Sequence, residues 1–494
     1  MQSVRLMNRI LLLASVFLIS LGVARSFSQQ RGGGDDIVAR IKAEGLQRSR
    51  VLALYRTLTD DIGARLTGSP AHVQAARWAQ ERFKEFGMTN PHLEPYEFGR
   101  GWEVDGISVE MTEPRYQRLT AYAEAWTPST KGVVTGKVIY VGDKTAAQIQ
   151  GMAGELRGAI ILTHLPQADW VDHDRPQPGL NDQPVSTGNP ALPGARSTTP
   201  VDMLMPILQR AGAAVALRPS PYRDGTVGVT GNRNTATDSV PSIIVAGEQY
   251  NILARLAAAG KPASMRVELR ARYIEDDRNS YNVIAEIPGR DPAMRDQVVM
   301  VGAHLDSWHT AAGATDNADG AAAVLEAMRI LQAIGAQPRR TIRAALWSGE
   351  EEGLLGSRAY VQQHFATPAQ REQLYVYLND DPGSGKTLGF YMEGNRAAKT
   401  IFDRWLGPLR DLGASRNILE GIGSTDHVPF NEAGMPGFNV IKDFDSYDAR
   451  TRHTNADYSE RLSENELKES AIFIATFAWQ AAVADEKILH SAAK

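Results

Sequence analysis

The sequence predicts an α/β protein in which a layered C-terminal region with a largely parallel sheet follows a β-rich region and N-terminal helices. Three observations support this fold class. After Asn282, short apolar runs typical of strands alternate with segments of helical periodicity. Short β-rich segments dominate 119–268 instead, and apolar residues recur at helical spacing between 36 and 86.

The N-terminal region, 35–118, is expected to supply helices that cover the sheet. Ile37, Ile41, Val51, Leu54 and Leu58 recur at helical spacing, and a second helical run, 71–86, follows the breaker Gly68-Ser69-Pro70. Upstream, Arg5 and Arg9 precede an apolar stretch over 10–23 and several small residues, the pattern of a secretory signal. We expect residues 1–28 to be a signal peptide and the protein to be periplasmic or secreted. An uncleaved anchor is the alternative, but the stretch is shorter than the roughly 20 residues that cross a bilayer, so no stable membrane anchor is expected.

The region 119–268 is expected to form a separate β-rich unit, with strands such as 137–141 and 159–163. It also contains Pro166 to Pro200, a segment with seven prolines that belongs on a surface or over a cleft. Within this segment, the run Trp170-Val171-Asp172-His173-Asp174 has side chains able to bind a cation. A solvated loop cluster is the favoured interpretation.

The C-terminal region, 269–494, carries the predicted parallel sheet. Strands are expected at 298–301, 341–347, 374–378 and 437–441, with a helix over 321–331 after the first strand. Ser463 and Glu466 form a capping box that opens a final helix.

Composition limits the function classes. The formal net charge is -4 and no basic field is present, which disfavours nucleic-acid binding. The chain has no cysteine, which removes disulfides, thiol catalysis and cysteine-ligated metals. Any metal ion must therefore be held by His, Asp and Glu.

Polar residues follow four of the predicted strands directly. Since ligands bind at the carboxyl ends of the strands in open α/β sheets, we expect these residues to meet at one edge. They are His304 and Asp306 with Asp316 in the next loop, then Glu350, Glu351 and Glu352, then Asp380 and Asp381, and finally Arg452 and His453.

Such a collection suits metal-assisted hydrolysis, in which two divalent ions share a bridging carboxylate and a free carboxylate accepts a proton from water. His304, Asp316, Glu351, Asp381 and His453 fit the ligand roles, which leaves Glu350 as general base. Asp306 is placed to orient the His304 imidazole. Each residue alone is more readily explained as a cap or turn residue than as a ligand, and only their conjunction indicates a site. The remaining histidines are interpreted as surface or satisfied residues: His72, His92, His164, His309, His364 and His490.

The motifs around these residues resemble the co-catalytic di-zinc exopeptidases, a family that includes bacterial leucyl aminopeptidases and secreted glutamate carboxypeptidases. The similar segments are Gly302-Ala303-His304-Leu305-Asp306-Ser307, Gly313-Ala314-Thr315-Asp316-Asn317, Trp347-Ser348-Gly349-Glu350-Glu351, 379–383, His453-Thr454, 63–69 and 423–430.

The resemblance implies a three-layer α/β/α catalytic domain with a mixed, mainly parallel sheet and a protease-associated insert over 119–268. It implies two zinc ions bridged by Asp316, with His304 and Glu351 completing one site, Asp381 and His453 the other, and a cis peptide after Asp316. The spacing favours Asp381 over Asp380 as ligand. Arg452 stands where relatives polarise the substrate carbonyl, although a surface salt bridge would also explain it. Asp426 and His427 are candidates to line the substrate pocket, or they belong to a structural turn.

The function expected is a secreted zinc exopeptidase acting on peptides, with an aminopeptidase favoured because Glu352 and Asp380 would attract a substrate ammonium. The alternatives are a carboxypeptidase or dipeptidase of the glutamate carboxypeptidase type, a metal amidase or glutaminyl-cyclase-like enzyme, or a binding protein without catalysis. The sequence leaves open whether the protein forms a homodimer.

Overall fold

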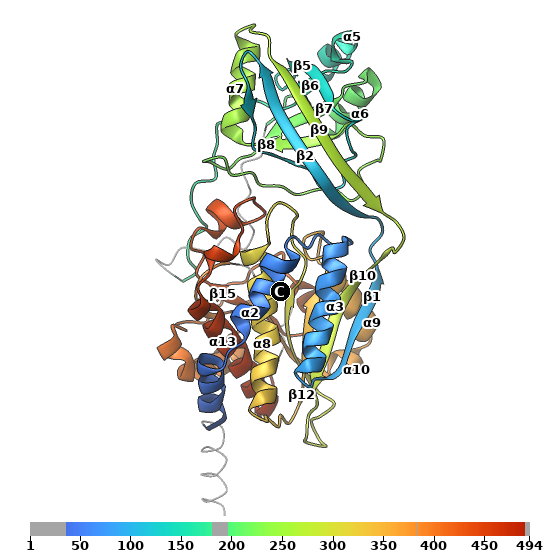
Figure 1. Cartoon of the computed structure of the whole chain (residues 1–494). Coiled ribbons are helices and arrows are strands. Elements are labelled where there is room, and N and C mark those ends of the chain that lie inside the picture. Colours follow the sequence, from blue (N-terminus) through green and yellow to red (C-terminus); the bar gives the residue numbers. More distant parts are fainter. Residues whose placement is uncertain (1–35, 180–195, 382, 490–494) are drawn as a thin grey trace, which may run out of the picture.

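The computed structural model of the protein describes residues 36–179, 196–381 and 383–489 (Figure 1). The expected signal peptide over 1–28, half of the proline-rich segment and His490 lie outside these residues. Within the described ranges, none of the helices combines the length and the apolar character that crossing a membrane requires.

The main unit (residues 36–100 and 275–489) is built on a seven-stranded mixed sheet in the order β1-β10-β12-β11-β13-β15-β14. The four central strands are parallel to one another, and β1, β10 and β14 are antiparallel to their neighbours. The strands are β1 (Thr89–Glu97), β10 (Asn279–Ile287), β11 (Val298–His304), β12 (Thr341–Trp347), β13 (Leu374–Asn379), β14 (Thr387–Tyr391) and β15 (Gly437–Lys442).

Helices cover both faces of this sheet, which confirms the predicted α/β/α class. In β11, Val299 and Val301 pack into the larger core with the helices α2, α3, α8 and α13, whereas Met300 packs into a second core with α9 and α12. This alternation follows from the two-residue period of a strand buried on both faces. The helical elements are α2 (Val51–Arg56), η1 (Thr57–Ile62), α3 (Pro70–Glu85), η2 (Ala314–Ala318), α8 (Asp319–Ala333), α9 (Leu355–His364), α10 (Pro368–Arg371), α11 (Arg396–Leu406), η3 (Gly407–Leu412), α12 (Val428–Glu432), η4 (Tyr447–Thr451), η5 (Ser459–Arg461) and α13 (Glu464–Val483).

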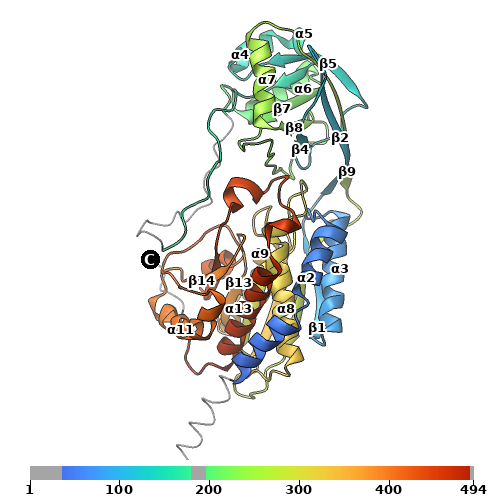
Figure 2. The same ribbon diagram turned by 60° about the vertical axis from the view of Figure 1, so that its left-hand side comes forward.

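A second unit, the insert (residues 101–274), interrupts the main sheet between its paired strands β1 and β10. It lies beyond one end of the main unit (Figures 1 and 2). Its sheet has eight strands in the order β3-β2-β9-β5-β6-β7-β8-β4. The elements are β2 (Gly101–Glu113), β3 (Gln117–Arg118), β4 (Ala121–Ala123), β5 (Val134–Tyr140), α4 (Ala146–Gly151), α5 (Ala153–Leu156), β6 (Ile160–Leu162), α6 (Val201–Ala211), β7 (Val215–Pro219), β8 (Ser242–Val245), α7 (Gly247–Ala258) and β9 (Ser264–Ile274).

Several local expectations can be compared with these elements. The Ser463–Glu466 capping box opens α13 as expected. The N-terminal region is less helical than predicted, because β1 and the long strand β2 lie within 35–118. The second sheet consequently extends past the predicted 119–268 on both sides, from β2 to β9. His72 also differs from its interpretation as a satisfied histidine: it is fully buried, and its ring nitrogens have no hydrogen-bond partner among the described residues.

Candidate metal centre

The carboxyl ends of the parallel strands bring the predicted residues together. His304 is the last residue of β11, Glu350 and Glu351 follow β12, and Asp381 follows β13. Asp316 comes from η2, and His453 follows η4. The peptide bond between Asp316 and Asn317 is cis, as the resemblance implies.

Five of these residues form two clusters that share Asp316. The His304 cluster contains His304, Asp316 and Asp381, and the His453 cluster contains Asp316, Glu351 and His453; in each, the ligand atoms lie within 4.8 Å of one another. This grouping corrects the pairing implied by the resemblance. His304 is grouped with Asp381 rather than Glu351, since its Nε2 lies 3.5 Å from Asp381 Oδ1, and His453 Nε2 lies 3.0 Å from Glu351 Oε2.

Asp316 reaches both clusters with different oxygens. Its Oδ1 lies 3.2 Å from His304 Nε2, and its Oδ2 lies 3.3 Å from His453 Nε2. Tyr447 Oη also donates a hydrogen bond of 2.9 Å to Oδ2. A carboxylate that turns one oxygen to each cluster has the geometry of a bridging ligand.

Asp306 acts on the site differently from the prediction. The Nδ1 of His304 lies 3.1 Å from the main-chain carbonyl of Asp306 but 3.7 Å from its carboxylate. That carboxylate instead accepts hydrogen bonds from the main-chain N–H of Glu351, at 3.2 Å, and from Thr67 Oγ1, at 3.1 Å. Asp306 therefore orients His304 through its main chain and fixes the turn that carries Glu350 and Glu351 through its side chain.

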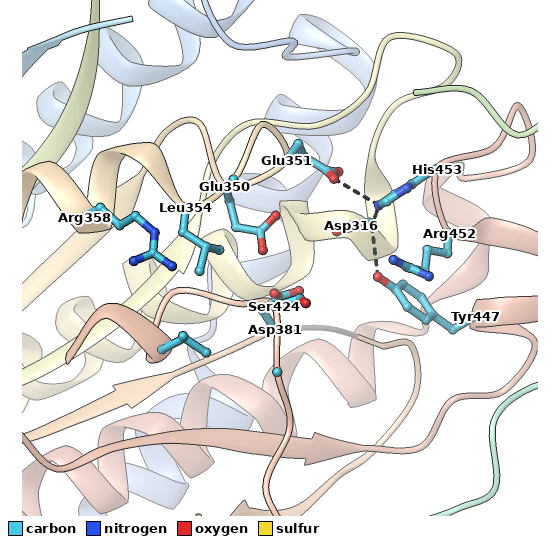
Figure 3. Close-up of a pocket in the computed structure, with 13 residues that line it drawn as sticks. Asp316, Glu350, Glu351, Leu354, Arg358, Asp381, Ser424, Tyr447, Arg452 and His453 are labelled. Atoms are coloured by element: carbon cyan, nitrogen blue, oxygen red, sulfur yellow. Dashed lines mark hydrogen bonds and ion pairs between the residues drawn. The ribbon is translucent and has the colours of Figure 1, made fainter. Parts of the chain in front are cut away.

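Glu350 lies in the same cavity as the two clusters. The cavity has a volume of about 400 Å³, and its lining includes Glu350, Asp316, Glu351, Asp381 and His453. Figure 3 shows Glu350 between the two clusters and Arg358, with Tyr447 and Arg452 at the opposite end. Burial raises the pKa of the Glu350 carboxyl well above its usual range, and a raised pKa makes a carboxylate a stronger proton acceptor.

The electrostatics of the clusters favour a cation. Burial works against ionisation of Asp316, but the imidazoles of His304 and His453, 3.2 and 3.3 Å away, outweigh it and hold the pKa of Asp316 well below its usual range. Burial likewise disfavours the charged form of His453, yet Glu351 and Asp316 raise its pKa to about 9. Positive charge is thus stabilised between these carboxylates.

The donor set also fits divalent metal ions. His304 Nε2, Asp381 Oδ1 and Glu351 Oε1 are buried and have no hydrogen-bond partner within the described part of the chain. Leaving such groups unpaired is costly unless another species binds them. Imidazole and carboxylate donors with one shared carboxylate suit ions such as zinc.

Two side chains near the clusters were not predicted. Tyr447, the donor to Asp316, is fully buried. Lys442 is buried at the end of β15, where its Nζ lies 2.9 Å from Asp380 and also contacts Asp319. An aromatic or lysine residue 60 or more positions away in sequence gives no local sign of such contacts, so only the tertiary structure identifies them.

The structure places one of the three predicted substrate-binding residues in the cavity lining and the other two outside it. Arg452 lines the cavity, but Asp426 and His427 are absent from its lining, which corrects that expectation. The Asp426 carboxylate accepts a hydrogen bond from Ser357 Oγ, and His427 Nε2 lies 3.1 Å from Glu393. The negative charges expected to attract a substrate ammonium are also absent from the lining: Asp380 pairs with Lys442, and both carboxylate oxygens of Glu352 are buried.

Comparisons with known proteins agree with this geometry. Residues 282–478 match the model of Peptidase family M28. Carboxypeptidase Q of Mus musculus is 24% identical over 481 residues, which cover 96% of this chain and 95% of the relative.

Two solved structures share the fold. The peptidase M28 precursor of Shewanella amazonensis SB2B has a TM-score of 0.71 at 21% identity, covering 93% of this chain and 99% of its own. A zinc aminopeptidase from Bacillus subtilis has a TM-score of 0.60 at 19% identity, covering 88% and 96%. Residues 282–478 thus form a Peptidase family M28 domain, and the protein is a metallopeptidase, a hydrolase.

Proposed function

We propose that this protein is a co-catalytic two-zinc exopeptidase in which Glu350 is the general base. The observation that carries the proposal is the pair of clusters sharing Asp316 in one cavity with a carboxylate, Glu350, that belongs to neither. His304 and Asp381 would hold one ion, Glu351 and His453 the other, and Asp316 would bridge them. Zinc is favoured by the donor set and by the name of the Bacillus subtilis enzyme.

Each side chain then has a defined task. Bound zinc would supply a water of lowered pKa and an electrophile for the scissile carbonyl. Glu350 accepts the proton of the attacking water at its carboxylate and returns it to the leaving amine. Asp306 keeps Glu350 in place through the turn that it anchors, with the main-chain N–H of Glu350 3.4 Å from Asp306 Oδ1.

Two specificities are candidates: removal of residues from the N-terminus of a peptide and removal from its C-terminus. Aminopeptidase action, the expectation from the sequence, agrees with the name of the Bacillus subtilis neighbour, but the two acidic residues behind that expectation are absent from the cavity lining. A specific observation favours the second candidate, a carboxypeptidase or dipeptidase. Arg452 is 8% exposed and lines the cavity, yet its guanidinium has no hydrogen bond or ion pair with any described residue. A buried, unpaired guanidinium facing a cavity is suited to a substrate carboxylate.

One experiment tests whether the protein is an exopeptidase and from which end of a peptide it removes residues. A mixed-sequence pentapeptide in free, N-acetylated and C-amidated forms is incubated with the purified protein and zinc or a chelator, and the products are followed by mass spectrometry. Loss from the N-terminus that acetylation stops indicates an aminopeptidase, and loss from the C-terminus that amidation stops indicates a carboxypeptidase. Survival of all three peptides with zinc would refute the exopeptidase proposal and favour an amidase or cyclase.

The variant Arg452→Met tests whether this residue binds the substrate carboxylate or polarises the scissile carbonyl. If Arg452 holds the substrate carboxylate, the variant loses discrimination between the free and the C-amidated peptide, and KM for the free peptide rises. If it polarises the scissile carbonyl instead, kcat falls equally for both peptides. Export through residues 1–28 and a protease-associated character of the insert remain proposals from the sequence.

A further inference from the structure

The insert contacts the segment that carries His453 along its main chain. The N–H of Val229 donates a hydrogen bond of 2.8 Å to the carbonyl of His453, and Gly228 forms an antiparallel bridge with Thr454. Val227 is bonded to Asn455 in both directions, since its N–H donates to Asn455 Oδ1 at 2.7 Å and its carbonyl accepts the Asn455 N–H at 3.1 Å. The ligand-bearing segment is thus paired like a short strand with the insert.

A tyrosine of the insert extends this contact. Tyr222 is fully buried, and its Oη donates a hydrogen bond of 3.2 Å to the carbonyl of Arg452. His453 itself has a φ of 57°, a left-handed conformation that costs a non-glycine residue about 1–2 kcal/mol. The bonds on either side of His453 hold the main chain in this conformation.

Asp174 and Arg175, in the proline-rich segment of the insert, form a second set of contacts with the element before His453, η4. Asp174 accepts hydrogen bonds from the main-chain N–H of Ser446, at 2.6 Å, and of Ala449, at 2.9 Å. Arg175 forms a buried bidentate ion pair with Asp448, with Nε 2.6 Å from Oδ2. These contacts therefore lie on both sides of Tyr447, whose hydroxyl donates a hydrogen bond to Asp316.

These contacts reach the His453 cluster and, in the shared Asp316, only the oxygen Oδ2 that faces His453. Within the described ranges, the hydrogen bonds of His304 and Asp381 come from the main unit: His304 bonds the Asp306 carbonyl, and the Asp381 carbonyl accepts from Asn439. The insert reaches His453 directly and Asp316 through Tyr447. Trp308, which packs into the core of the insert, adds an aromatic contact with His453 at 6.0 Å between ring centroids.

We propose that the insert is a structural part of the metal centre, in which Asp174 and Tyr222 position His453 and Tyr447 and so set the affinity of the His453 cluster for its ion. This inference rests on the two-metal function proposed above. Residues that orient metal ligands without binding the metal typically contribute 10–100-fold to metal affinity. The insert thereby controls one of two unequal sites.

The test is a zinc titration of the full-length, metal-free protein by calorimetry. Wild type is expected to take up two ions. Asp174→Ala removes both acceptors for η4, and Tyr222→Phe removes only the hydroxyl that bonds Arg452. Each should weaken one of the two binding steps, Asp174→Ala by about 10–100-fold, and leave the other unchanged. Asp174→Asn, which retains one acceptor oxygen, should recover part of the loss.

Two matched variants control for general destabilisation. Asp172→Ala removes an exposed carboxylate of the same segment that pairs with His173, and Tyr250→Phe removes a buried hydroxyl of the insert that bonds His164. Neither touches η4 or the His453 segment, so both zinc affinities should stay at the wild-type value. In a His453→Ala background, Asp174→Ala should no longer affect the remaining ion.

Three outcomes oppose the inference. Unchanged affinities in Asp174→Ala and Tyr222→Phe would overturn it, and so would equal weakening of both steps or the same weakening in Tyr250→Phe. Activity gives a separate readout, since raising the zinc concentration should restore kcat of Asp174→Ala if only affinity is lost. If wild type itself binds fewer than two ions, the two-metal function fails before any variant is compared.

Discussion

His72 allows a stability prediction that does not depend on the metal centre. The residue lies in the first turn of α3 with 0% exposure, and neither ring nitrogen has a hydrogen-bond partner in the described ranges. A buried polar group without a partner costs about 1–3 kcal/mol. Replacing it with a similarly sized apolar side chain, His72→Leu, should therefore raise the free energy of unfolding at pH 7 by about 1–3 kcal/mol.

The pH dependence of the unfolding free energy gives a second quantitative prediction for His72. Burial lowers the pKa of His72 from 6.5 to about 4, so the folded protein binds this proton less readily than the unfolded chain. Stability is therefore lost as pH falls from 6.5 towards 4. One pKa unit corresponds to about 1.4 kcal/mol, so acidification from pH 7 to pH 5 costs wild type about 2 kcal/mol at this residue. His72→Leu escapes that cost, and its advantage over wild type should widen by about 2 kcal/mol at pH 5.

Denaturant unfolding of the metal-free proteins at pH 7 and pH 5, followed by tryptophan fluorescence, measures this difference. Taking variant minus wild type at each pH cancels the other titrating groups. His173→Leu replaces an imidazole whose side chain is 86% exposed and serves as the control, with no change in the gap expected. An advantage of His72→Leu that stays constant or shrinks at pH 5 would refute the reasoning, because it would mean that His72 is protonated in the folded protein.

Three further substitutions test the centre and its support. Glu350→Gln should lower kcat by about 10²–10⁴-fold while zinc content by atomic absorption stays at the wild-type value, and retained activity would exclude Glu350 as the base. Asp316→Ala should empty both clusters, so full zinc occupancy would count against the bridge. Lys442→Met leaves Asp319 and Asp380 buried without their cation and should lower the unfolding free energy by about 3–5 kcal/mol, and unchanged thermal stability would show that the pair adds nothing.

The sequence predicted the parallel core of the main sheet because its strands are continuous apolar runs. Strand 341–347 was placed at the observed bounds of β12, and the residues after each run meet at one edge. The edge strand β1 was missed for the opposite reason. β1 contains Pro91 and Pro95 and is only partly buried, so it lacks both apolar continuity and clear alternation.

The five proposed ligands were identified from sequence, but their pairing was not. Strand order β12-β11-β13 places His304 between the other two strand ends, and the sequence alone does not reveal which neighbour its ring faces. The contacts of Asp174 and Tyr222 with the His453 segment were equally inaccessible. They join each of these side chains to main-chain groups more than 200 positions away, and a main-chain partner leaves no residue-type signature in the sequence.

Adjacent acidic residues show how the fold separates neighbours in sequence. Asp381 points into the cavity, whereas Asp380 points to the other side of the strand end, where Lys442 and Ser470 bind its carboxylate. Asp380 was expected to place a negative charge near the substrate, but Lys442 neutralises it. Apart from the proposed ligands and Glu350, the charged side chains in the cavity lining are Arg358, which pairs with Glu432, and Arg452, whose guanidinium has no partner among the described residues. The charge in the lining that no described residue neutralises is therefore positive, which supports the carboxypeptidase or dipeptidase candidate proposed above.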